Sequence, residues 1–136
     1  MRTGGCQCGE VRFSLKGEAG ALYVCHCREC RKQSASAFGL SLDVPRSSLT
    51  LTAGEPGSWS RGTDSGRRLD CFFCPTCGTR LWHVGGGSPD RVTVKGGALD
   101  DDVDISRATH IWTKRRLEGV IIPEGCESFA EEPPAG

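Results

Sequence analysis

The 136-residue sequence lacks an excess of charge of either sign, because 17 Lys and Arg residues balance 17 Asp and Glu residues. With zero formal net charge and no basic stripe with interleaved aromatics, we expect no nucleic-acid binding. The sequence also lacks any apolar run close to the roughly 20 residues of a membrane span. Its opening, MRTGGCQCGE, has no apolar core of a signal peptide. We therefore expect no membrane association and a cytoplasmic location.

Apolar residues are also scarce, at 37% of the chain, whereas there are 19 glycines, seven prolines and nine cysteines. The length predicts one domain over residues 1–136, with an irregular tail from about residue 127. The Gly and Pro content indicates many turns between short elements. In a reducing compartment, clustered cysteines are metal ligands or reactive thiols rather than disulfides. We expect metal to reinforce a modest core.

Alternating apolar and polar residues predict a mainly β fold. One or two short helices are expected, with residues 28–36 as the best candidate, and the glycine-rich stretch 4–9 and the acidic stretch 100–106 are expected to be loops. The predicted strands cover residues 10–15, 21–27, 38–44, 49–53, 59–61, 67–73, 80–84, 91–99 and 109–115.

The sharpest local motif is C-P-x-C-G, in which two cysteines share a turn and Gly78 supplies a positive φ cheaply. Cys6 and Cys8 form a similar glycine-flanked pair. Two such pairs make a closed four-cysteine site, for which we predict a structural zinc through Cys6, Cys8, Cys74 and Cys77. A competing register would use Cys71 with Cys74, but aromatic residues lie between these cysteines and no glycine follows.

The cluster C-x-C-x-x-C contributes three further cysteines: Cys25, Cys27 and Cys30. Three thiolates with an open fourth position are typical of a catalytic zinc, because structural zinc sites are closed by four protein ligands. Alternatively, Cys71, Cys126 or His26 supplies a fourth ligand and the site is a second structural zinc. Spacing alone leaves both readings open.

The segments GGCQCGEVRF, CHCRECRKQSASAF, FFCPTCGTRLW and HIW occur in an order that resembles the glutathione-dependent formaldehyde-activating enzyme family. The resemblance runs from about Gly4 to Trp112. It implies a tent-like arrangement of short antiparallel sheets with zinc-binding knuckles. It also implies two Zn²⁺ per chain, one structural on the four-cysteine set and one catalytic on the three-cysteine set. The implied activity is a carbon–sulfur lyase that joins a thiol, glutathione or similar, to a small aldehyde, or the reverse.

The sequence departs from the family pattern at four places. Cys71 and Cys126 lie outside the seven shared cysteines, and RRLEGVII follows HIWTK where a Pro-Trp pair is common. Ala35 stands where glycine is common. The Ala35 and RRLEGVII changes fall in regions that could shape a substrate pocket.

An anionic thiol such as glutathione requires cations near the open site. Arg28, Arg31 and Lys32 are the nearest in sequence, and Arg80 follows the knuckle; a solvated surface role is the alternative reading. His26, His83 and His110 are candidates for proton transfer, and His110 is also a candidate substrate contact. A non-catalytic zinc scaffold that binds another protein, and a redox enzyme using Cys126 or Cys71, are the competing functions.

Overall fold

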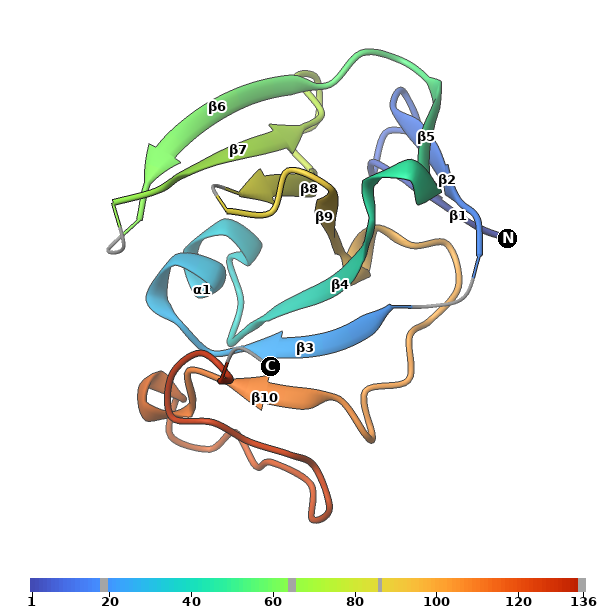
Figure 1. Ribbon diagram of the computed structural model, residues 1–136. Coiled ribbons are helices and arrows are strands. Elements are labelled where there is room, and N and C mark those ends of the chain that lie inside the picture. Colours follow the sequence, from blue (N-terminus) through green and yellow to red (C-terminus); the bar gives the residue numbers. More distant parts are fainter. Residues whose placement is uncertain (18–19, 64–65, 86, 135–136) are drawn as a thin grey trace. The chain divides into compact units, whose positions relative to one another are not determined.

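Figure 1 shows the computed structural model, which describes residues 1–17, 20–63, 66–85 and 87–134. The chain clusters into two compact units, each built from two stretches of sequence. The first unit comprises Met1–Gly20 with Leu42–Val103, and the second comprises Ala21–Ser41 with Asp104–Gly136. The predicted single domain stays a prediction. Residues 18–19, 64–65 and 86, which fall between predicted strands where turns are expected, and residues 135–136 of the predicted tail lie outside the described residues.

The first unit contains a three-stranded antiparallel sheet of β1 (Arg2–Gly5), β2 (Arg12–Leu15) and β5 (Leu49–Ala53), in the order β1-β2-β5. Phe13 and Leu15 of β2 are buried, whereas Arg12 and Ser14 are half-buried. This alternation gives the sheet one apolar face. At Gly4, opposite Phe13, an added Cβ would meet the Phe13 ring at 2.6 Å, so only glycine fits there.

The first unit also contains an antiparallel meander of β6 (Gly57–Gly62), β7 (Arg68–Phe73), β8 (Arg80–Gly85) and β9 (Arg91–Lys95). The later part of β4 (Gly39–Pro45) lies beside β9. Trp82 of β8 packs edge-on against Phe13 and stacks with Phe72, with ring centroids 5.7 Å apart in both pairs. Phe13 and Trp82 are buried, so their contact is part of the unit's core, and the half-buried Phe72 packs beside it.

The second unit contains β3 (Ala21–Cys25), the short helix α1 (Arg28–Ser34), the start of β4 and β10 (Thr109–Ile111) (Figure 1). β10 runs parallel to β3, and Ile111 pairs with Cys25. Gly39 begins β4 beside the helix, where an added Cβ would lie 3.1 Å from the Cβ of Cys30. The three-cysteine segment therefore sits between a strand end and a helix start.

The mainly β fold class is confirmed, and the predicted helix and most strands are present. Three local predictions were wrong. Residues 4–5 belong to a strand rather than a loop, because their backbone pairs with residues 12–13. β10 ends at Ile111, since Trp112 adopts a left-handed backbone with φ of 57°, and it is parallel rather than antiparallel to its neighbour. The acidic stretch 100–106 is a largely exposed loop, as predicted, and within it Asp100 accepts hydrogen bonds from Arg12 and Thr3.

Candidate metal centres and a cationic cavity

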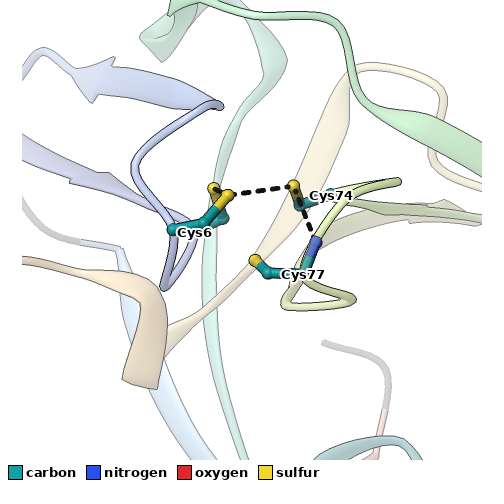
Figure 2. A group of neighbouring side chains, drawn as sticks. Cys6, Cys74 and Cys77 are labelled. Carbon is teal, nitrogen blue, oxygen red and sulfur yellow. Dashed lines mark hydrogen bonds between the residues drawn. The ribbon is translucent and has the colours of Figure 1, made fainter.

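Four cysteine sulfurs of the first unit converge. Cys6 and Cys8 lie on the turn after β1, and Cys74 and Cys77 lie on the turn after β7; all four sulfurs are within 4.8 Å of one another. The Sγ atoms of Cys6 and Cys8 are 3.6 Å apart, and those of Cys8 and Cys74 are 3.8 Å apart. Figure 2 shows Cys6 and the Cys74–Cys77 pair pointing toward one another from the two turns. The residues predicted to share a metal are therefore brought together.

Each of these turns has a glycine at positive φ, as the sequence predicts for Gly78. Gly78 has φ of 84° and Gly9 has φ of 83°. The amide of Gly9 donates to the carbonyl of Cys6 at 3.1 Å, and the amide of Gly78 donates to that of Cys74 at 2.8 Å. Since a left-handed backbone is cheap only for glycine, these two positions allow the chain to reverse directly after each cysteine pair.

Hydrogen bonds join the two turns independently of any metal. The Gln7 amide donates to Oγ1 of Thr79 at 3.0 Å, and the Thr76 hydroxyl donates to Oε2 of Glu10 at 2.6 Å. The hydroxyl of Thr79 also lies 3.3 Å from Sγ of Cys77. This side-chain hydrogen bond is the main cause that lowers the pKa of the Cys77 thiol to about 5. The arrangement favours the thiolate, which is the form that binds metal.

Sequence reasoning missed Glu10 and Thr79, although a signal was present. Each directly follows the positive-φ glycine of its turn, Gly9 or Gly78. A polar side chain at this position lies where it can reach the opposite turn. The common position of the two residues in the two motifs could have identified them.

The second group consists of Cys25, Cys27 and Cys30, whose sulfurs lie within 4.8 Å of one another. Cys25 ends β3, Cys27 is the residue that caps α1, and Cys30 lies in the first turn of the helix. The Cys30 amide donates to Sγ of Cys27 at 3.3 Å, so the capping bond itself positions one sulfur. Nε2 of Gln33 donates to Sγ of Cys30 at 3.5 Å. The local helix start thus gathers the three thiols.

The three thiols share their protons unequally. Hydrogen bonds from Cys25 and then Cys30 lower the pKa of Cys27 to about 2. The pKa of Cys25 is raised, first because of its hydrogen bond with Cys27. Within this group the thiolate is therefore favoured at Cys27, and the proton is held at Cys25.

No fourth Cys, His, Asp or Glu of the described residues joins this group. The candidates considered from the sequence have other surroundings. Cys71 is buried in β7, which belongs to the first unit, and the Cys126 thiol donates to the carbonyl of Ser106 at 3.2 Å. His26 is fully buried, and its Nε2 lies 2.9 Å from Nδ1 of His110. Three sulfurs, rather than four ligands, define this group in the described part of the chain.

The cationic residues predicted beside this group line one cavity of about 430 Å³, together with Ala35 and Ser36. They are Arg28, Arg31 and Lys32, all on α1. None of the three has an ion-pair partner within residues 1–17, 20–63, 66–85 and 87–134. Three cations without carboxylate partners make the cavity attractive to an anionic ligand. Arg80 lies elsewhere, in the first unit, with its guanidinium 6.0 Å from the centroid of the exposed Trp59 ring.

Ala35, the residue that stands where glycine is common, closes the helix with φ of 51° and ψ of 42°. Its amide donates to the carbonyl of Lys32 at 3.1 Å, as in a helix-terminating turn. A left-handed backbone costs a residue with a Cβ roughly 1–2 kcal/mol. The departure from glycine therefore falls on the one position of the helix end where glycine has a structural advantage.

His110, a predicted substrate contact, is 4% exposed and does not line the cavity. Its ring stacks with that of His26 at a centroid distance of 5.2 Å. Burial lowers the pKa of both imidazoles, so both are neutral near pH 7. His83 is half-buried on β8, where it pairs with Cys71. A substrate role for His110 stays a prediction. The closest side-chain contact of His110 is with His26, which lies between Cys25 and Cys27.

The family described as glutathione-dependent formaldehyde-activating enzyme matches residues 1–115. The chain belongs to this family. The match contains all seven clustered cysteines and the cations of α1, and it ends before the C-terminal segment. Membership associates the chain broadly with glutathione and formaldehyde chemistry and with small-molecule substrates.

The fold is similar to a crystal structure of a Rhodobacter sphaeroides protein determined by the Northeast Structural Genomics effort. The TM-score is 0.64 at 22% sequence identity, and the similarity covers 79% of this chain and 98% of that chain. This likeness supports the fold. In the described part of the chain, no helix combines the length and apolar character that crossing a membrane would require.

Proposed function

We propose that this member of the family is a zinc-dependent carbon–sulfur lyase that adds a glutathione-like thiol to a small aldehyde, or catalyses the reverse. The observation that carries the proposal is the three-sulfur group of Cys25, Cys27 and Cys30 at the start of the helix whose cations line the cavity. A closed structural site would have four protein ligands, which is the number of thiols that the other cysteine group offers.

The donor atoms fit zinc. Thiolates are soft ligands that favour zinc over magnesium or calcium. With Zn–S bonds of about 2.3 Å, tetrahedral geometry gives sulfur–sulfur distances of about 3.8 Å. The distances of 3.6 and 3.8 Å in the four-cysteine group agree with this value. We infer a structural zinc on Cys6, Cys8, Cys74 and Cys77 and a catalytic zinc on Cys25, Cys27 and Cys30, two per chain.

A zinc ion held by the thiolates of Cys25, Cys27 and Cys30 would act as a Lewis acid and would lower the pKa of an incoming thiol. The chain's own residues bind and orient the substrate. Arg28, Arg31 and Lys32 would hold the carboxylates of a glutathione-like thiol and offset the net charge of about −1 that three thiolates and one Zn²⁺ create. The aldehyde is held next to the thiol, and this orientation is the main advantage over the reaction in water.

The balanced reaction joins RSH and H₂C=O to give RS–CH₂–OH. The sulfur–carbon bond forms, the carbonyl π bond breaks, and the thiol proton ends on the former carbonyl oxygen. No oxidant or reductant is required. The reverse reaction releases the same two molecules.

The test combines metal content with the rate of adduct formation. We expect two zinc ions per native chain, and a rate of S-hydroxymethylglutathione formation above the uncatalysed rate, followed by NMR with glutathione and formaldehyde. Cys27→Ser should lose one zinc and the catalysed rate, whereas the matched control Cys126→Ser should retain both. Two zinc ions with no rate above the protein-free control would favour the non-catalytic scaffold, and loss of rate in the control alone would favour a redox thiol.

The role of the cavity can be tested separately. Arg31→Gln and Lys32→Gln should each raise the KM for glutathione by roughly fivefold or more with little change in kcat, because they remove a charged contact made before the reaction. Arg46→Gln, which removes an exposed arginine outside the cavity, is the control. An unchanged KM in both cavity variants would exclude these cations as the carboxylate site.

A further inference from the structure

The C-terminal segment Glu127–Glu132 lies beyond the residues that the family match covers, yet it is bonded along the end of β10 (Figure 1). The His110 amide donates to the Glu127 carbonyl at 2.9 Å, and the Phe129 amide donates to the His110 carbonyl at 2.9 Å. The Thr113 amide then donates to the Phe129 carbonyl at 3.1 Å. A segment with the composition of a frayed tail is therefore tied to the chain on both sides of Trp112.

Trp112 is the residue that this segment holds. Its φ of 57° is unfavourable for a bulky side chain and persists only where neighbouring contacts impose it. Its amide donates to the Glu131 carbonyl at 3.2 Å, and its indole Nε1 donates to Oε1 of Glu132 at 2.7 Å. Lys114 lies 5.2 Å from the centroid of the indole ring and forms an ion pair with Glu131. Two consecutive glutamates thus fix both the backbone and the ring.

Trp112 and Phe129 pack against the buried cluster of Cys25, Cys30 and Ile111, where Tyr23 and Cys27 also lie. One of the two aromatic rings belongs to the segment, and the other is held by it. The three-sulfur group therefore has an aromatic wall whose position depends on residues outside the family match. The four-cysteine group belongs to the other unit, which does not include Glu127–Glu132.

We propose that Glu127–Glu132 is a strap that holds Trp112 and Phe129 against the Cys25, Cys27 and Cys30 group and thereby limits the access of thiols and chelators to it. Trp112, Glu131 and Glu132 are positioning residues in this proposal. It rests on the proposed function only in requiring that the three sulfurs bind a metal. The strap sets how quickly that metal exchanges its ligands.

The test compares two double variants that remove the same charge. Glu131→Gln with Glu132→Gln weakens the strap, whereas Glu118→Gln with Glu124→Gln removes two exposed carboxylates that have no hydrogen-bond or ion-pair partner among the described residues. Zinc-loaded protein is mixed with a chromophoric chelator, and the release of each of the two zinc ions is followed. Cys27→Ser identifies which kinetic phase belongs to the three-sulfur group.

We expect the strap variant to release zinc from the three-sulfur group about threefold to tenfold faster, as for the loss of two exposed charged contacts. Release from the four-cysteine group and both phases of the control should stay unchanged. Equal acceleration of both phases would show a general loss of stability, and no acceleration would show that the segment does not limit access; either result overturns the proposal.

A second measurement tests the strap even if the double variant folds poorly or the protein does not bind zinc. Glu132→Ala alone removes the acceptor of the indole hydrogen bond and leaves the Glu131–Lys114 ion pair in place. In metal-free protein, mass spectrometry can compare the alkylation rates of Cys25, Cys27 and Cys30 with those of the four-cysteine group. Selective acceleration at the three cysteines supports the strap, and parallel rates overturn it. A chain that binds only one zinc would instead overturn the proposed function, so the two failures are distinguishable.

Discussion

Replacing Ala35 by glycine should stabilise the protein, which is the opposite of the usual effect of a glycine. Ala35 adopts φ of 51° at the C-terminal end of α1, and its side chain is exposed, so truncation loses little packing. Relief of the left-handed conformation is worth roughly 1–2 kcal/mol. The added freedom of the unfolded chain costs about 0.4–1 kcal/mol. The expected net gain is about 0.5–1 kcal/mol.

The assay is thermal unfolding followed by circular dichroism. With an unfolding entropy of about 2.1 cal/mol/K per residue, this gain raises the Tm of a 136-residue chain by about 2–4 °C. Free zinc must be buffered at the same concentration for all variants, because bound metal adds its own stabilisation. The matched control is Ala37→Gly, two residues later, where φ is not positive.

Ala37→Gly should lower the Tm by a similar amount, since it gains unfolded-state entropy without relief of strain. The reasoning would be refuted if Ala35→Gly lowered the Tm as much as Ala37→Gly does. A stabilised variant with an unchanged KM for glutathione would further show that the Ala35 methyl group does not restrict the cavity. Opposite signs at two nearby alanines would assign the effect to the backbone conformation.

Three further predictions concern the metal groups and the first unit. Thr79→Val should raise the pKa of Cys77 and weaken zinc binding at the four-cysteine group by about tenfold to a hundredfold, measured by chelator competition; unchanged affinity would contradict the role of the hydroxyl. Cys71→Ser should leave two zinc ions per chain by elemental analysis, since Cys71 lies outside both sulfur groups; loss of one zinc would contradict this arrangement. The pKa of Asp100 is lowered from 3.8 to about 2, first by its hydrogen bonds with Arg12, so its stabilising contribution is present above pH 3.8 and lost as the pH falls toward 2. The difference in urea midpoint between the native chain and Asp100→Asn should therefore shrink between about pH 4 and pH 2, and a constant difference would exclude the ionic contribution.

The elements that the sequence revealed are those with a local physical signature. Glycine next to a cysteine pair indicates a tight turn, and the structure places Gly9 and Gly78 at positive φ in both turns. The alternation of apolar and polar residues identified β2 and β9 as strands, because every second side chain of these strands enters the core. The helix start at Cys27 follows from the three cysteines and from the polar, charged residues of its first turn.

The features that sequence reasoning missed depend on partners far away along the chain. β1 is rich in glycine and has no alternation, and only its pairing with β2 makes it a strand. The parallel pairing of β10 with β3 leaves no local pattern. The contacts of Trp112 with Glu131 and Glu132 are similarly invisible, because a backbone carbonyl carries no residue-specific signal and acidic tails are usually solvated.

The two-part composition of the second unit has a consequence for the order of events during synthesis. The buried partner of His26 is His110, 84 positions later. At a translation rate of about 5–20 residues per second, roughly 4–17 seconds separate the emergence of these two residues from the ribosome. During that interval Cys25, Cys27 and Cys30 are already outside but lack β10 and its aromatic neighbours. The nascent chain therefore passes through a window in which these thiols are exposed to oxidants and to competing metals.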